Sequence, residues 1–149
     1  MSSRAEQARR NFRQGYNCCQ SVLLAFTAEL GLERKALARL GSSFGGGIGR
    51  MRETCGAVSA MAMVLGLLEG YDQPQDQAGK AALYQRVQAL AAQFREEAGS
   101  LLCRELLAGV QTAPGPLPEA RTEAYYQRRP CESYIALAAR LLEQELGLS

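Results

Sequence analysis

Apolar residues recur at intervals of three and four along most of the chain, and glycine or proline interrupts the pattern at several points. This spacing places apolar side chains on one face of a helix, so it predicts a succession of helices. Three of them are each followed by a glycine that suits a helix C-terminus, at Gly15, Gly31 and Gly41. We expect helices at about 3–14, 18–30, 33–40, 55–68, 77–98 and 131–146, with a short one in SLLCRELLAG.

The segment 55–68 is apolar nearly all round, whereas the helices predicted at 18–30, 77–98 and 131–146 are amphipathic. A helix without a polar face belongs in the interior, so 55–68 is expected to be the buried centre of the bundle. Alanine and leucine supply most of the apolar content and β-branched residues are few, which favours helices over strands. The sequence therefore predicts an all-α single domain over 1–149, a bundle of about six or seven helices. The proline-rich stretch VQTAPGPLPEA is expected to be an extended connection.

Charge changes this picture little. Seventeen lysines and arginines against fifteen acidic residues give a net charge of +2, too balanced to indicate nucleic acid or an acidic membrane as partner. The longest nearly continuous apolar run, Ala57 to Leu68, is shorter than the roughly 20 residues that span a bilayer. The start of the chain lacks the apolar stretch of a leader segment. We expect a soluble cytoplasmic protein that is not embedded in a membrane.

Cysteine usage is the compositional oddity, with five cysteines and no histidine. The lack of histidine excludes zinc sites with mixed Cys and His ligands and every nucleophile activated by histidine. Structural disulfides are uncommon in a reducing compartment. The cysteines are thus left with thiol redox chemistry, metal binding through sulfur, or inert burial as small apolar side chains.

Three cysteine positions coincide with predicted helix N-termini, where free amide groups and the helix dipole favour a thiolate. Cys18 and Cys19 follow Asn17, Cys55 follows Thr54, and Cys131 follows Pro130. Arginines at 50, 52, 128 and 129 lie close in sequence to Cys55 and Cys131, and would favour the thiolate further if they point toward the sulfur. Cys103, inside LLCRELL, fits inert packing as well. Taken together, three cysteines at helix starts favour reactivity or ligation over packing.

Cys18 and Cys19 are expected to have different roles, because adjacent helical side chains point about 100° apart. At most one of the two can comfortably face a shared site, and Cys18 is our candidate. Cys19 is then expected to be dispensable, packed as a small apolar side chain or facing solvent.

The loop GSSFGGGIGR suggests a second kind of site, since glycine amides can approach a phosphate closely. Its candidate cofactor-binding residues are Gly45, Gly46, Gly47, Gly49 and Arg50. The spacing completes neither GxxxxGK[ST] nor GxGxxG, so a turn beside the cysteines is favoured over nucleotide binding. Gly56 shares a helix face with Ala60, which suits either tight helix packing or the floor of a flat ligand site, and packing is favoured.

The order GYNC, FGGGIG, CGAVSA, LGL and two single later cysteines resembles the C-GCAxxG-C-C family of redox-active proteins, with four characteristic cysteines and a CGAxxG motif. The resemblance covers essentially the whole chain. It implies that the family cysteines are Cys18, Cys55, Cys103 and Cys131, and it leaves Cys19 out. Ala60 departs from the pattern, which has glycine there. A helical redox or cofactor-binding protein is the implied function.

Our leading hypothesis is a thiol redox protein in which Cys55 and Cys18 are the primary pair, close enough to bridge, and Cys103 and Cys131 resolve it or form a second pair. Cys55 is expected to be the most acidic thiol. The partner would be a thiol redox protein or a small electron carrier, and no cofactor is needed. One alternative has the same four cysteines (Cys18, Cys55, Cys103 and Cys131) holding a metal or iron-sulfur cluster. Another is a structural helical homo-oligomer with inert thiols.

Overall fold

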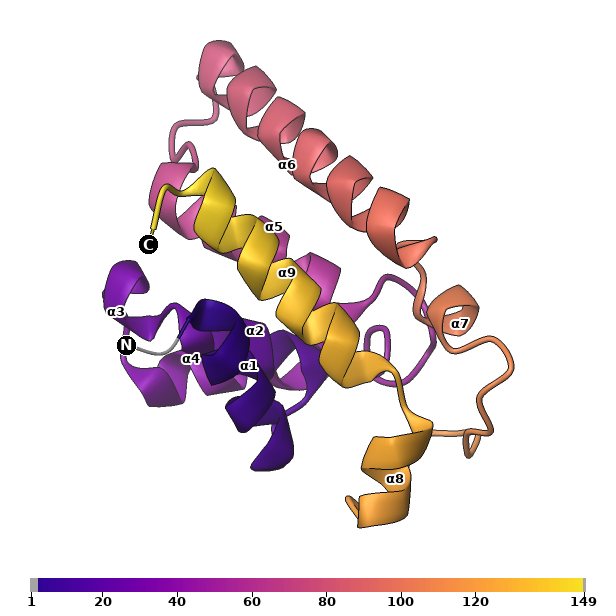
Figure 1. Ribbon diagram of the computed structural model, residues 1–149. Coiled ribbons are helices and arrows are strands. Elements are labelled where there is room, and N and C mark those ends of the chain that lie inside the picture. Colours follow the sequence, from indigo (N-terminus) through magenta and orange to yellow (C-terminus); the bar gives the residue numbers. More distant parts are fainter. Residues whose placement is uncertain (1–2, 149) are drawn as a thin grey trace.

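A computed structural model describes residues 3–148, and its regular secondary structure is helical throughout that range (Figure 1). The all-α prediction is therefore confirmed. The helices are α1 (Arg4–Arg13), α2 (Cys18–Ala25), α3 (Thr27–Leu30), α4 (Arg34–Gly41), α5 (Gly56–Glu69), α6 (Gln77–Ala98), α7 (Cys103–Leu106), α8 (Glu123–Arg128) and α9 (Cys131–Glu145), with a 3-10 turn η1 (Ser42–Phe44) after α4.

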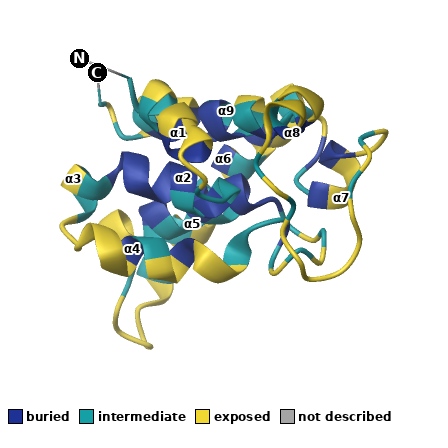
Figure 2. Ribbon diagram, turned by 90° about the horizontal axis from the view of Figure 1, so that it is seen from below, coloured by how far each residue is buried: buried dark blue, intermediate teal, exposed yellow. Residues whose placement is uncertain are grey.

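Helices α2 and α5 share the centre of the bundle. Helix α5 packs against α2, α6 and α9, and α2 in turn contacts α1, α4 and α9. Figure 1 shows α5 and α9 side by side, with α6 running alongside them. The buried residues gather on α2, α5 and α9 (Figure 2). The predicted central helix is thus central along most of its length, although its end is exposed at Leu67 and Leu68.

The predicted helix 18–30 is interrupted at Phe26, which separates α2 from α3. Phe26 has φ −110° and ψ 18° and is completely buried. The Thr27 hydroxyl donates to the Leu24 carbonyl at 2.7 Å, a side-chain bond of the kind that bends helices. Apolar spacing continues through this break, so periodicity alone predicted one helix.

Helix ends follow the sequence signals in some places and not in others. Asn17 caps α2 in a capping box with Gln20, and Gly31 follows α3 with a left-handed φ of 68°. Gly41 is not a cap: it is the last residue of α4, with φ −82°. A Cβ at Gly41 would lie 3.1 Å from Leu23 and 3.3 Å from the Cys19 sulfur, so this glycine serves the contact between α4 and α2.

Gly56 allows the start of α5 to approach the start of α2. A Cβ on Gly56 would lie 2.8 Å from the Phe44 carbonyl oxygen, 3.0 Å from the Cys19 amide and 3.1 Å from the Cys18 Cβ. Real Cβ contacts essentially never fall below 3.0 Å, so no other residue fits without movement. Tight packing, the favoured interpretation of the small-residue face, is what the structure has at this end of α5.

None of the helices in residues 3–148 combines the length and the apolar character that crossing a membrane requires.

Gly56→Ala is expected to lower the free energy of unfolding by about 1–3 kcal/mol, because the added methyl group overpacks a contact made with backbone atoms. Gly66→Ala, in the same helix, is the matched control, since nothing lies within 4 Å of its Cβ position. That change should raise stability by about 0.5–1 kcal/mol through helix propensity. Urea denaturation of both variants measures the difference. Equal stabilisation by the two alanines would contradict the close approach.

Candidate functional site

Four of the five cysteines surround one small cavity, which we call the thiol cavity. Its volume is about 10 Å³, close to the space that one water molecule occupies. It is lined by Cys18, Cys55, Cys103, Cys131, Gly47, Gly56, Leu106, Leu107 and Tyr134. These are the four cysteines that the sequence singled out. Cys19 faces elsewhere: it is fully buried, and its thiol contacts the Met63 sulfur at 3.8 Å.

Three of the four sulfurs come from helix N-termini. Cys18 and Cys131 are the first residues of α2 and α9, and Cys55 is the N-cap of α5. The sequence assigned that cap to Thr54, which instead forms an isolated antiparallel bridge with Leu102. The close approach at Gly56 brings the starts of α2 and α5 together. Cys18 and Cys55 line the same cavity but are both free, so the expected bridge between them is not confirmed.

The fourth cysteine, Cys103, is brought in by the bridge. Its amide donates to the Glu53 carbonyl at 2.7 Å, and the Cys55 amide donates to the Leu101 carbonyl at 2.8 Å. The glycine loop packs against it, because a Cβ on Gly47 would lie 2.7 Å from the Cys103 Cβ and 2.6 Å from the Glu53 amide. Gly47 also has a left-handed φ of 75°. Both constraints require glycine at this position.

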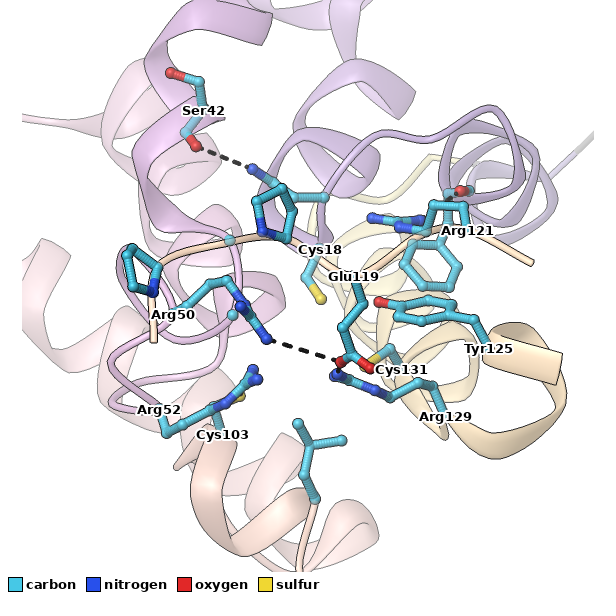
Figure 3. A pocket seen from close by; sticks show the side chains of 18 residues that line it. Cys18, Ser42, Arg50, Arg52, Cys103, Glu119, Arg121, Tyr125, Arg129 and Cys131 are labelled. Atoms are coloured by element: carbon cyan, nitrogen blue, oxygen red, sulfur yellow. Dashed lines mark hydrogen bonds and ion pairs between the residues drawn. The ribbon is translucent and has the colours of Figure 1, made fainter. Parts of the chain in front are cut away.

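A second and larger cavity of about 430 Å³ lies beside the thiol cavity, within the size range of ligand pockets. We call it the arginine cavity. Cys18, Cys103 and Cys131 border both cavities, whereas Cys55 lines the thiol cavity and is not among the residues around the arginine cavity. The charged side chains of its wall are Arg50, Arg52, Arg121, Arg129 and Glu119, with Tyr125 beside them (Figure 3).

The proline-rich stretch forms one wall of this cavity. It is extended, as predicted, and Pro116 and Pro118 line the space. Arg50 holds it by donating to the carbonyls of Ala113 at 2.9 Å, Gly115 at 3.0 Å and Leu117. This connection is therefore part of the site and not merely a link between helices.

On the opposite side, Arg121 fixes the wall to α1. Its guanidinium donates to the carbonyls of Phe12 and Tyr16, both at 3.1 Å. It also lies over the rings of Phe12 and Tyr125, at 4.5 and 5.0 Å from their centroids.

A hydrogen-bonding interaction between the thiols of Cys18 and Cys131 shifts the pKa values of the two groups in opposite directions. That bond stabilises a thiolate on Cys131, and the nearby Arg129 guanidinium adds to the effect. Against the opposing influence of burial, the two lower the pKa of Cys131 to about 7. The same bond, with burial, raises the pKa of Cys18 well above that of an ordinary thiol. In this pair the proton is therefore favoured on Cys18 and the negative charge on Cys131.

Cys55 differs from the prediction that it is the most acidic thiol. Burial raises its pKa to about 12, although the amides of Ala57 and Val58 favour the anion. Burial likewise raises the pKa of Cys19 to about 12. The prediction for Cys55 is therefore wrong, because desolvation outweighs the helix N-terminus and the arginines near it in sequence lie elsewhere.

Not all of the arginines near the cysteines in sequence contact a sulfur. Arg52 donates to the Cys103 sulfur at 3.9 Å, which opposes the burial that raises the pKa of Cys103. Arg128 is half-exposed and forms an ion pair with Glu119 at 2.9 Å. Sequence reasoning missed Glu119, Arg121 and Tyr125, which lie up to twelve positions from the nearest cysteine and showed no motif.

The candidate cofactor-binding residues are divided between the two cavities. Gly45, Gly46, Gly49 and Arg50 line the arginine cavity, while Gly47 and Gly56 line the thiol cavity. Gly45 also has a packing role, because a Cβ there would lie 2.8 Å from the Cβ of Asn17. Ligand binding by these residues stays a prediction.

All five cysteines lie within the described residues and are free. In the same part of the chain, no group of three or more His, Cys, Asp or Glu side chains has the arrangement of a metal site.

A family model described as "Putative redox-active protein (C_GCAxxG_C_C)" matches residues 16–145. No curated protein and no solved structure is similar enough to the chain to count as a match. The family label orders its central motif as GCAxxG, so the motif begins at Thr54 in this chain. Ser59, and not Ala60, then stands at the final glycine position of the motif.

Alkylation of the reduced protein is expected to begin at Cys131 as pH rises, with its rate half-maximal near pH 7, because its thiolate is the most stabilised of the five. Cys18→Ala should move that midpoint to higher pH by removing the hydrogen bond. Cys19→Ala should leave it in place. Iodoacetamide labelling at a series of pH values, followed by peptide mass spectrometry, measures each thiol. Labelling of Cys55 ahead of Cys131 would contradict this assignment.

Proposed function

The chain belongs to the C_GCAxxG_C_C family, and on that premise we propose that it exchanges thiols with disulfides through Cys131 and Cys18. Cys131 is the attacking thiolate and Cys18 the resolving thiol. The observation that carries this proposal is the placement of Cys18 and Cys131, which border both the thiol cavity and the arginine cavity, with Arg129 in the wall beside them.

Cys131 is suited to the attack by charge and by position. A thiolate is the nucleophile in disulfide exchange, and a thiol whose pKa lies near ambient pH combines a useful thiolate fraction with strong nucleophilicity. The residue is 8% exposed, but it borders the arginine cavity, so a substrate in that space can reach the sulfur. A Cys131 side chain that served only for packing would need neither the arginine cavity nor the Arg129 guanidinium beside it.

The chemistry balances without an added cofactor. The Cys131 thiolate attacks one sulfur of a disulfide RSSR, which forms a mixed disulfide and releases RS⁻. Cys18 gives up its proton, which the released thiolate accepts, and the Cys18 sulfur attacks the Cys131 sulfur. That step releases the second RS⁻ and leaves a Cys18–Cys131 disulfide. Two protein thiols are oxidised, and RSSR is reduced to one RSH and one RS⁻.

This pairing differs from the primary pair expected from the sequence, which joined Cys18 to Cys55. Cys131 borders the arginine cavity together with Cys18, whereas Cys55 lines only the thiol cavity and burial raises its pKa to about 12. In the proposed exchange, Cys55 and Cys103 complete the apolar surroundings of the pair and take no part in the attack.

We expect reduced protein treated with bis(2-hydroxyethyl) disulfide to form a Cys18–Cys131 bridge. Cys131→Ser should slow the reaction by more than about 100-fold, because a hydroxyl replaces the attacking thiolate. Cys18→Ser should stop it at a stable mixed disulfide on Cys131. Peptide mapping under non-reducing conditions and the intact mass distinguish these species.

Cys19→Ala is the matched control, since it changes the neighbouring cysteine in the same helix and should keep the rate within about twofold. A bridge between Cys18 and Cys55 would contradict the proposed pair. Stoichiometric metal in anaerobically purified protein, with the thiols protected from alkylation, would overturn the exchange function. It would support the alternative in which the four cysteines bind a metal or a cluster.

A further inference from the structure

The arginine cavity carries more positive than negative charge. Among the described residues of its wall, four are arginines, against one glutamate and the Cys131 thiol, whose anion the arginines favour. The pKa of Arg50 reflects this excess. Burial is the largest cause that lowers it, and repulsion from Arg52 and Arg129 lowers it further. An enclosed surplus of cations is unfavourable unless an anion joins it.

Glu119 does not supply the missing charge, because it is already shared. It pairs with Arg129, with Arg128 at 2.9 Å, and with Arg50 at 3.8 Å. Arg50 and Arg121 are in addition satisfied by the backbone carbonyls that they bind at the cavity wall. Glu119 and these carbonyls therefore already have donors.

Two guanidinium donors remain without an acceptor. Arg52 Nη2 and Arg129 Nε are both buried and have no hydrogen-bond partner in the part of the chain that the structure describes. The Arg129 side chain is only 5% exposed, so water from outside does not readily serve it. Both side chains line the cavity and point into the space between them (Figure 3). A buried charged donor without an acceptor is costly, and a planar guanidinium is well matched to an oxyanion.

We propose that the arginine cavity binds the carboxylate of an anionic, low-molecular-weight disulfide through Arg52 and Arg129. This rests on the exchange function proposed above and names the chemical class of its substrate. Arg129 flanks Cys131, and Arg52 contacts Cys103, so an anion held between them lies next to the reacting sulfurs. A volume of about 430 Å³ admits a small molecule, whereas a folded protein partner would have to bind outside.

Binding of an anion is compatible with the attack. The largest influence on the Cys131 thiolate is the hydrogen bond from Cys18, which a carboxylate on the arginines does not remove. The surplus of guanidinium groups also leaves positive charge for the thiolate released from the substrate.

Three disulfides of similar length test the charge: 3,3′-dithiodipropionate, bis(2-hydroxyethyl) disulfide and cystamine, which are anionic, neutral and cationic. At low salt the reduced protein should react with the anionic disulfide at least about 10-fold faster than with the cationic one. Arg52→Met should reduce that preference to about threefold or less, and Arg52→Lys should keep part of it. Arg104→Met is the matched control, because Arg104 is exposed, pairs with Glu53 and does not line the cavity.

A second measurement separates this inference from the exchange function. Octanedioate has the chain length of 3,3′-dithiodipropionate with methylene groups in place of the sulfurs. Calorimetric titration should detect its binding to the wild type and not to Arg52→Met, whereas 1,6-diaminohexane should not bind either protein. Binding of octanedioate without any disulfide exchange would support the anion site and overturn the exchange function. Exchange at equal rates with all three disulfides, without octanedioate binding, would overturn the anion site alone.

Discussion

The candidate site depends on the contact between the starts of α2 and α5, where Gly56 leaves no room for a side chain. This contact places Cys55, at the N-cap of α5, against Cys18, the first residue of α2. Helix α9 packs on both helices and adds Cys131 at its own start. A longer side chain at position 56 would separate the sulfurs, so the glycine after the cysteine has a geometric purpose.

The same packing that collects the thiols also makes most of them weak acids. Helix N-termini and nearby cations favour a thiolate, but desolvation opposes it, and for Cys55 and Cys19 desolvation is the stronger influence. Cys131 is buried as well, yet it gains a hydrogen bond from Cys18 and the charge of Arg129. The pKa values of the cysteines around the thiol cavity therefore differ because their partners differ, although all four line the same small space.

The sequence was most informative where local signals decide the structure. Helix positions, the Asn17 cap and the division of roles between Cys18 and Cys19 follow from spacing and capping rules that act within one turn. The thiol pairing and the arginine cavity could not be predicted in this way. The bridge between Thr54 and Leu102, and the contact of Arg121 with α1, join segments about 48 and 109 residues apart. The break at Phe26 between α2 and α3 could not be predicted, because a buried aromatic residue there continues the apolar spacing.

The glycine loop combines a local backbone conformation with contacts to distant segments of the chain. Its residues Gly46 to Arg50 have φ values between 55° and 75°, and Arg52 has φ 63°, so two arginines adopt a left-handed conformation that costs L-residues about 1–2 kcal/mol. The loop closes on itself through bonds such as Arg52 N to the Gly46 carbonyl at 3.1 Å. An extended loop would avoid the strain. In the conformation observed, Arg50 holds the proline-rich wall and Arg52 reaches Cys103, so the strained backbone is what assembles the charged side of the cavity.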